Sequence, residues 1–239
     1  MYYSDLTFPT PEENLACDEA LLDRCEEGKS DEVLRFWEPA QYFVVVGYGN
    51  KVRIEVNLPY CRINNTPILR RCTGGGTVLQ GPGVLNYSLI LRIEEGGPVQ
   101  SISATNDFIL QRTQTALATL LKAPVEMCGQ TDLAIGGLKF CGNAQRRKKH
   151  FLLFHGSFLL HLDIDLVEKA LPQPSKQPEY RFNRSHSDFL MNLKVPAAML
   201  KPALQKTWDA YVPLTAVPSD QIAGLAREKY ALKEWNFKF

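Results

Sequence analysis

The stretch "RRCTGGGTVLQGPGVLNYS", residues 70–88, sets three consecutive glycines between two arginines and an apolar run typical of a β-strand. An interior glycine costs roughly 0.5–1 kcal/mol more than alanine in chain entropy, so three in succession need a structural reason. Either the backbone turns sharply at Gly74, Gly75 and Gly76, or a ligand approaches it closely. The run matches neither G-x-x-x-x-G-K-[ST] nor G-x-G-x-x-G before a helix, which excludes two common nucleotide-binding loops.

Composition and charge limit the class of protein. The 239 residues include 27 basic and 26 acidic side chains, a balance that argues against nucleic acid as the main partner. The N-terminal segment lacks the pattern of a signal peptide, and no apolar run approaches the roughly 20 residues needed to cross a bilayer. The six cysteines include no C-x-x-C, which favours free thiols over a zinc ribbon or a disulfide framework. We therefore expect a cytoplasmic protein with no membrane partner.

The first helix has clear boundaries in "TPEENLACDEALLDRCEEG", residues 10–28. Thr10 is a predicted N-cap, Pro11 occupies the first helical position, and Glu13 completes a capping box. The helix should run through Cys25 and stop at Gly28.

The order of the remaining elements indicates the fold class. Segments rich in β-branched and aromatic residues predict strands near 33–39, 42–49, 67–76, 77–93 and 132–164. Helices are predicted at about 104–122, 164–171, 196–211 and 218–232. Several strands follow one another without an intervening helix, which parallel βαβ units do not allow. We expect one α+β domain over residues 1–239 with a largely antiparallel sheet.

The arginines next to the glycines suggest what this loop could bind. A backbone without side chains can press its N–H groups against an anion, and the adjacent Arg71 carries a planar guanidinium suited to phosphate or carboxylate. A simple hairpin tip is the competing interpretation.

A second informative stretch is "TDLAIGGLKFCGNAQRRKK", residues 131–149. Lys139 follows a predicted Gly-Gly hairpin turn and precedes small residues, which leave room for a ligand beside its ammonium group. A solvated surface charge is the alternative for a single lysine. Asp132 is either a turn residue or a ligand of a metal ion that accompanies a nucleotide. His155 interrupts an apolar strand, either as a core histidine or as part of a pocket wall.

The order of several short motifs resembles that of the lipoate–protein ligase A family. These are NLACDEALL, VVVGYGN, RRCTGGGTV, LNYS, TDLAIGGLKFCGNAQRR and HGSFLL, spread over residues 11–193. The resemblance implies the fold shared with biotin ligases, a class II synthetase-like, mixed and mostly antiparallel sheet flanked by helices. It also implies that the ligand is faced by Arg71, Gly74, Gly75, Gly76, Asn86, Asp132, Lys139, Gly142, Ala144 and His155.

The same resemblance implies a reaction. Members of this family activate lipoate or octanoate with ATP and Mg²⁺ to an acyl adenylate, and then transfer the acyl group to a lysine of a lipoyl-domain protein. Such acceptors are the acyltransferase subunits of 2-oxoacid dehydrogenases and the glycine cleavage H protein. Lys139 would contact the adenylate and stabilise charge on the reacting carbonyl. Asp132 would be the candidate Mg²⁺ ligand.

The chain also departs from the family pattern. Gln80 and Gly81 stand where many members have His-Asp. The sequence ends about where the large domain of two-domain ligases ends, so we expect no C-terminal accessory domain. Archaeal relatives divided in this way use a separate partner chain for adenylation.

Two other functions stay open at this point. Related octanoyltransferases move an acyl chain from a carrier protein through a cysteine thioester, and Cys128 lies near the position of that nucleophile. Cys141 is a weaker candidate, and a buried structural thiol is the default interpretation of both. The third possibility is a lipoyl-binding module without catalytic activity.

Overall fold

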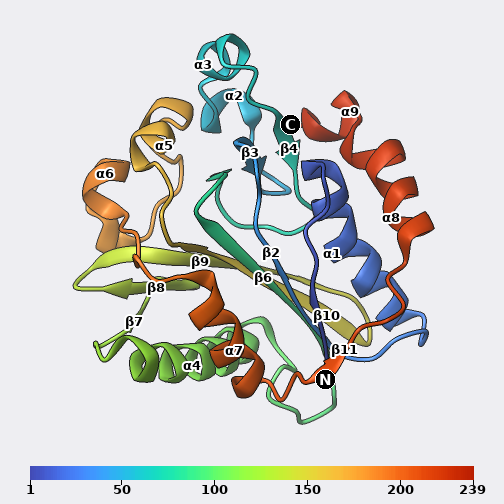
Figure 1. Ribbon diagram of the computed structural model, residues 1–239. Coiled ribbons are helices and arrows are strands. Elements are labelled where there is room, and N and C mark those ends of the chain that lie inside the picture. Colours follow the sequence, from blue (N-terminus) through green and yellow to red (C-terminus); the bar gives the residue numbers. More distant parts are fainter.

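The computed structural model describes residues 1–239, and its largest element is an eight-stranded sheet (Figure 1). In spatial order the strands of this sheet are β11 (Val212–Pro213), β1 (Tyr2–Asp5), β2 (Val33–Trp37), β6 (Val84–Arg92), β10 (Phe151–Leu159), β9 (Leu138–Arg147), β8 (Asp132–Ile135) and β7 (Glu126–Cys128). A smaller sheet has the order β4 (Ile68–Arg70), β3 (Phe43–Val46) and β5 (Val78–Gln80).

Most neighbouring strands are antiparallel. Only β1 with β2, β1 with β11, and β3 with β4 run parallel. The long strands β6, β9 and β10 follow one another through antiparallel pairing at the centre of the larger sheet. The predicted α+β class with a mixed, mostly antiparallel sheet is therefore confirmed. The sequence pattern did not separate the smaller sheet from the larger one.

The first helix, α1 (Pro11–Glu26), begins as predicted. The Thr10 side chain accepts a hydrogen bond from the Glu13 N–H, and the Glu13 carboxylate accepts one from the Thr10 N–H. Gly28 has φ +71°, which suits the residue that turns the chain away from the helix.

The other predicted helices form with shifted ends. They are α4 (Ile102–Leu121), α5 (Ile164–Ala170), α7 (Ala197–Thr207) and α8 (Ser219–Leu225), the last continued by a π-helical turn at Ala226–Tyr230. Four short helices escaped prediction, because one or two turns carry too little periodicity to detect: α2 (Val52–Glu55), α3 (Leu58–Ile63), α6 (His186–Phe189) and α9 (Lys233–Asn236). None of the helices is both long enough and apolar enough to span a bilayer.

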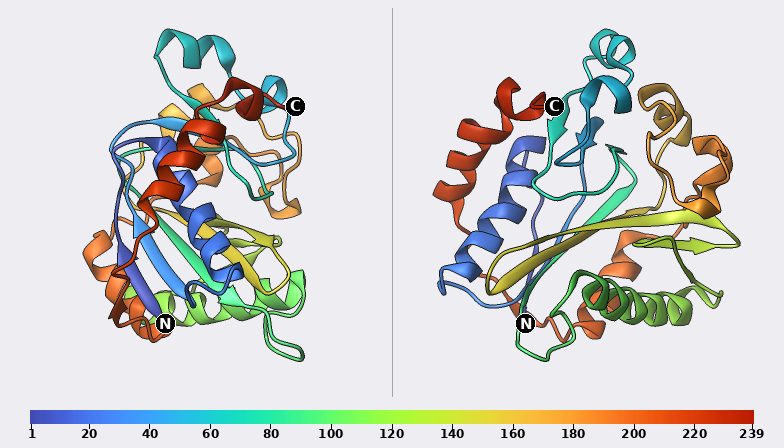
Figure 2. Two further views of the ribbon diagram at one scale, coloured as in Figure 1. Left: turned by 90° about the vertical axis from the view of Figure 1, so that its right-hand side faces the viewer. Right: turned by 180° about the vertical axis from the view of Figure 1, so that it is seen from behind.

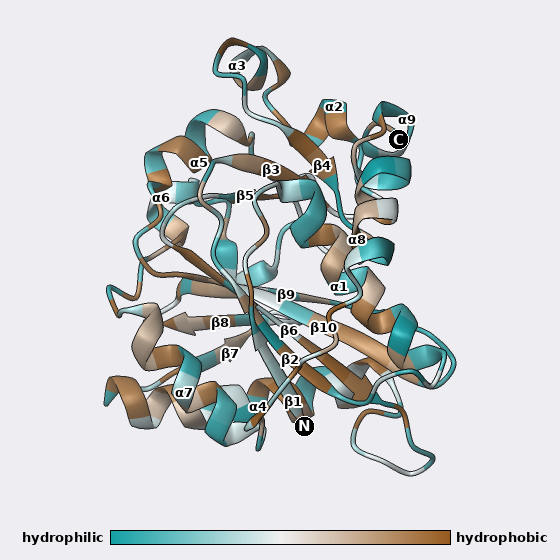
Figure 3. Ribbon diagram, turned by 45° about the vertical axis from the view of Figure 1, so that its right-hand side comes forward, coloured by the Kyte–Doolittle hydropathy of each residue, from teal (hydrophilic) through white to brown (hydrophobic).

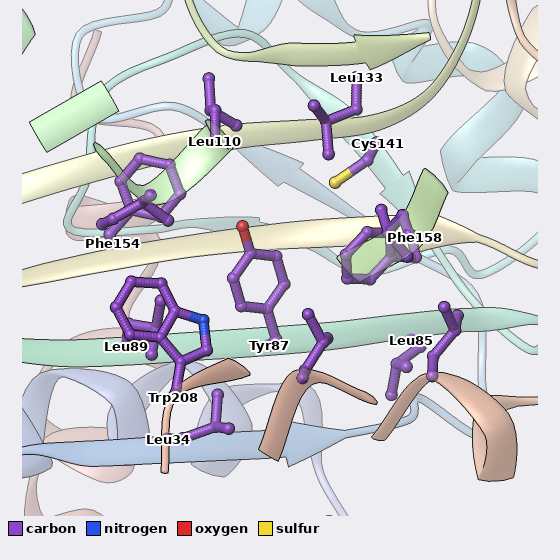
Figure 4. Close-up of a cluster of buried hydrophobic side chains, with 14 of the residues drawn as sticks. Leu34, Leu85, Tyr87, Leu89, Leu110, Leu133, Cys141, Phe154, Phe158 and Trp208 are labelled. Carbon is purple, nitrogen blue, oxygen red and sulfur yellow. The ribbon is translucent and has the colours of Figure 1, made fainter. Parts of the chain in front are cut away.

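The two faces of the larger sheet meet different partners (Figure 2). One face packs against α4 and α7; there Tyr87 and Phe154 meet Leu110 of α4 and Trp208 after α7 (Figure 4). The other face supports α1 and α8. In Figure 3, β10 is mainly hydrophobic, as expected for a strand covered on both faces.

Candidate active site

The face of the larger sheet that supports α1 and α8 also forms the floor of a cavity of about 1270 Å³. Residues paired across neighbouring strands project to the same side, so the pairing register defines rows of side chains. The first row is Trp37, Asn86, Ser157, Gly142 and Asp132, on β2, β6, β10, β9 and β8. The second row is Arg35, Ser88, His155 and Ala144. The register thus gathers five predicted ligand residues, Asn86, Asp132, Gly142, Ala144 and His155, on one floor.

The glycine run forms a loop at the edge of this floor, with its carbonyl oxygens already in use. Arg71 donates hydrogen bonds to the carbonyls of Gly74 and Gly76, and Asn50 donates one to that of Gly75. The N–H groups of the three glycines donate no hydrogen bond within the protein. Gly75 and Gly76 line the cavity. A run of exposed, free N–H groups is a site that favours an anion.

In the structure, Arg71 shapes the glycine loop. Its guanidinium is buried and bonds the side chain of Thr73 and the glycine carbonyls. Burial lowers the pKa of Arg71 to about 10, and no carboxylate contributes to that pKa. Most of its N–H donors thus form hydrogen bonds that shape the loop, although the side chain still borders the cavity. The preceding Arg70 is fully buried and bonds the carbonyls of Gly47, Tyr48 and Asn50.

Close approach explains two of the glycines in this region. Gly75 has φ +85°, and a Cβ there would lie 2.9 Å from Nη2 of Arg71 and 3.4 Å from Cβ of Ala144. A Cβ at Gly47, in the VVVGYGN stretch, would overlap the carbonyl oxygen of Gly75. The loop therefore packs tightly against its own protein on one side and leaves its N–H groups to the other.

Lys139 lies in the cavity, paired with Asp132 at 2.8 Å. The predicted Gly-Gly turn is present, with positive φ at Gly136 and Gly137. A register continued without a break from the Asp132–Gly142 pair would set Lys139 opposite Ile135, on the other face of the sheet. The pairing shifts by one residue between Leu133 and Ala134, so that Ala134 opposes Lys139, and this irregularity turns the lysine onto the floor.

Gly142 leaves the space that the lysine side chain occupies. A Cβ at Gly142 would lie 2.7 Å from Nζ of Lys139 and 3.6 Å from Oδ1 of Asp132. The Asp132 carboxylate is also bonded on its other oxygen, Oδ2, by the hydroxyl of Tyr180 at 2.8 Å.

The surroundings of Asp132 do not fit a resident Mg²⁺. Both of its oxygens already have donors, Lys139 and Tyr180, and no group of three or more potential metal ligands gathers anywhere in the protein. Mg²⁺ favours several oxygen ligands in near-octahedral geometry.

His155 belongs to a buried chain of hydrogen bonds that the sequence did not reveal. Its Nε2 lies 2.7 Å from Oγ1 of Thr73, and its Nδ1 lies 3.3 Å from Oδ2 of Asp18. Burial opposes ionisation of Asp18, but Arg35 at 2.6 Å, with His155 and Ser88, outweighs it and lowers the pKa of that carboxyl. Because Thr73 accepts from Nε of Arg71, its hydroxyl is free to donate to His155, which in turn donates from Nδ1 to Asp18.

The departures at Gln80 and Gly81 have local explanations. Gln80 and Asn86 exchange two side-chain hydrogen bonds of 2.9 Å, and Gln80 also donates to Ser157. A Cβ at Gly81 would overlap the ring of Tyr42. This wall of the cavity is therefore built from paired amides and contains no ionisable side chain at position 80.

None of the cysteines is an activated thiol in this structure. All six are free, and burial is the first cause that raises the pKa of each one. Cys128, on the edge strand β7, is half-buried, and the carboxylates of Glu126 and Asp132 raise its pKa further. Cys141 borders the cavity but is fully buried.

The basic run at residues 146–149 is largely neutralised within the protein. Arg146 pairs with Glu19, and Lys148 pairs with Asp23. Arg147 donates to the carbonyls of Val99 and Gln100. These contacts hold α1 and the segment before α4 against β9.

Comparisons with known proteins agree with this architecture. Residues 10–205 match the family model described as lipoyl protein ligase A/B catalytic domain. The octanoyltransferase LipM of Geobacillus kaustophilus is 29% identical, over 99% of this chain and 97% of that protein. Lipoate–protein ligase 1 of Staphylococcus aureus is 26% identical, over 99% of this chain and 73% of that protein.

A solved structure establishes the similarity of fold. The bi-partite lipoate protein ligase of Thermoplasma acidophilum, described with its E2 lipoyl domain, superposes with a TM-score of 0.82. It is 24% identical in sequence and covers 99% of this chain and 95% of its own. The relatives thus include both ligases and octanoyltransferases.

Proposed function

The chain belongs to the lipoyl protein ligase A/B catalytic domain family, and we propose that it is a lipoate–protein ligase. It activates lipoate or octanoate with ATP to an acyl adenylate and transfers the acyl group to a lysine of a lipoyl-domain protein. One observation carries this proposal: a single cavity is lined by the glycine loop, with its free N–H groups, and by the ammonium of Lys139.

The activation step has to bring two anions together. A carboxylate oxygen attacks the α-phosphorus of ATP, an O–P bond forms, and pyrophosphate leaves with the electrons of the broken P–O bond. The N–H groups of Gly75 and Gly76 supply donors for phosphate oxygens without blocking the approach. Lys139 supplies the positive charge that offsets the repulsion between the reactants.

The transfer step uses the same lysine. The acceptor amine attacks the acyl carbon, negative charge develops on the carbonyl oxygen, and AMP leaves as the C–O bond to phosphate breaks. The amine loses one proton to water. The Lys139 ammonium stabilises the developing oxyanion, and no covalent bond to the enzyme is needed.

An octanoyltransferase is the second candidate, and it is favoured by the names of relatives such as the Geobacillus protein. That reaction would pass the acyl group through a cysteine thioester, with Cys128 as the candidate. The raised pKa of Cys128 and its carboxylate neighbour Glu126 work against a thiolate. On this ground we rank the ligase first.

Three acyl donors distinguish the candidates in one experiment. The protein is incubated with a lipoyl-domain acceptor and either lipoate with ATP, preformed lipoyl adenylate, or octanoyl carrier protein without ATP. A ligase modifies the acceptor in the first two reactions. Modification from the adenylate alone indicates that a separate accessory chain completes adenylation, as in a bi-partite ligase.

Mass spectrometry of the intact protein completes the comparison. A stable octanoyl adduct that disappears in Cys128→Ser would replace the ligase proposal with the transferase. No modification from any donor, with lipoate still bound, would indicate a binding module without catalytic activity.

A further inference from the structure

Tyr180 connects the segment between α5 and α6 to Lys139. It lies in a short 3₁₀ turn, Glu179–Arg181, that borders the cavity. Its hydroxyl donates to Oδ2 of Asp132 at 2.8 Å, while Oδ1 of the same carboxylate accepts from Nζ of Lys139 at 2.8 Å. One carboxylate thus joins two side chains that are 41 residues apart in the sequence.

The position of Tyr180 does not depend on this hydrogen bond alone. Its ring packs against that of Phe189, with centroids 5.1 Å apart. Arg184 donates to the carbonyl of Tyr180 and also to that of Gly137, in the turn that leads to Lys139. The phenol is therefore anchored to the same hairpin that carries the lysine.

The hydroxyl remains a donor at working pH. Burial first, and then the Asp132 carboxylate, raise the pKa of Tyr180 well above its ordinary range. A bond from a neutral hydroxyl to a carboxylate is one of the stronger hydrogen bonds in proteins.

We propose that Tyr180 is a positioning residue for Lys139, acting through Asp132; this inference rests on the proposed acyl-transfer function. During the reaction the Lys139 ammonium must move from Asp132 to an oxygen of the substrate. With Oδ2 held by the phenol, the carboxylate cannot turn to follow the ammonium. Without that bond it rotates freely and competes with the substrate for the same cation.

A conservative substitution tests the hydroxyl alone. Tyr180→Phe keeps the ring against Phe189 and removes only the donor. We expect kcat to fall about 10- to 100-fold, the range for a lost hydrogen bond to a charged group. KM for lipoate and for ATP should stay within about threefold, because the binding surfaces are unchanged.

Tyr230→Phe is the matched control. Its hydroxyl also donates to a carboxylate, Glu19, at 2.8 Å, but Tyr230 does not border the cavity. This variant should lose some thermal stability and keep a wild-type kcat. Equal losses of kcat in both variants would indicate a general structural effect and overturn the inference.

A double-mutant cycle distinguishes an effect of Tyr180 through Asp132 from a general contribution of Tyr180 to the fold. If Tyr180 acts through Asp132, adding Tyr180→Phe to Asp132→Asn should change kcat less than twofold. Multiplying losses would overturn the inference, as would a wild-type kcat in folded Tyr180→Phe. Each protein is assayed with lipoate and ATP, with lipoyl adenylate, and with octanoyl carrier protein. A wild-type protein inactive with all three overturns the proposed function itself and this inference with it.

Discussion

The Lys139 ammonium lies 2.8 Å from the Asp132 carboxylate, next to a one-residue shift in the register of β8 and β9 between Leu133 and Ala134. A register continued unbroken from the Asp132–Gly142 pair would set Lys139 opposite Ile135, on the other face of the sheet, whereas the shift sets it opposite Ala134. The irregularity thus allows Lys139 and Gly142, three positions apart on β9, to share the face that carries Asp132.

Removal of this cation should abolish most of the activity without unfolding the protein. We expect Lys139→Ala to lower kcat about 10²–10³-fold, as for loss of one oxyanion-stabilising donor. Its side chain is partly exposed, so circular dichroism and the melting temperature should change little. Near-normal modification of the acceptor by the folded variant would refute the role of Lys139.

Gly142→Ala should displace the side chain of Lys139. The added methyl lies 2.7 Å from Nζ, the mobile end of a flexible chain, so the lysine will move and the backbone will not. We expect a fall in kcat of about tenfold or more with a small change in stability. Gly224→Ala, where a Cβ meets nothing within 4 Å, is the control. Unchanged turnover in Gly142→Ala would mean that the Asp132 contact is dispensable.

Gly75→Val should eliminate binding of an acyl-adenylate analogue. Its φ of +85° is unfavourable for a branched residue, and the side chain would press on Arg71, which shapes the loop. Calorimetric titration of a non-hydrolysable analogue measures the loss. Gly224→Ala, with ordinary φ, no atom within 4 Å and no contact with the cavity, should bind normally. Retained affinity in folded Gly75→Val would identify the loop as a simple turn.

Asp18 should make stability depend on pH in the acidic range. Its pKa is lowered in the folded protein, so its contribution is complete above the ordinary value of about 4 and is lost as pH falls further. Asp18→Asn leaves Arg35 buried without its partner, which costs about 3–5 kcal/mol at neutral pH. Urea unfolding of both proteins at pH 7 and near pH 3 should show this difference shrinking with acid. A constant difference would contradict the assignment.

Cys128 should react slowly with thiol reagents. Because partial burial and two carboxylates raise its pKa, its alkylation by iodoacetamide should have a midpoint above pH 8.5, the value of a free thiol. Cys128→Ser should retain ATP-dependent lipoate transfer. Rapid alkylation at pH 7, together with an inactive serine variant, would favour the thioester route.

Local patterns in the sequence were enough to predict several parts of this protein. The Thr10–Glu13 capping box, the Gly136-Gly137 hairpin and the predominantly antiparallel strand order depend on residues close together in the chain, and each forms as expected. The motif order also identified the family. In these cases the physical cause is local: caps, turns and side-chain periodicity act over a few residues.

Tertiary structure decided how the predicted residues work together. The sequence could not reveal that the Arg71 guanidinium bonds the glycine carbonyls, that Asp18 orients His155 from 137 residues away, or that Tyr180 holds Asp132. These contacts depend on strand register, on one irregular pairing and on the packing of α1 and the α5–α6 segment over the sheet. A one-residue shift in strand register moves a side chain to the other face of the sheet, and no local pattern around Lys139 encodes that shift.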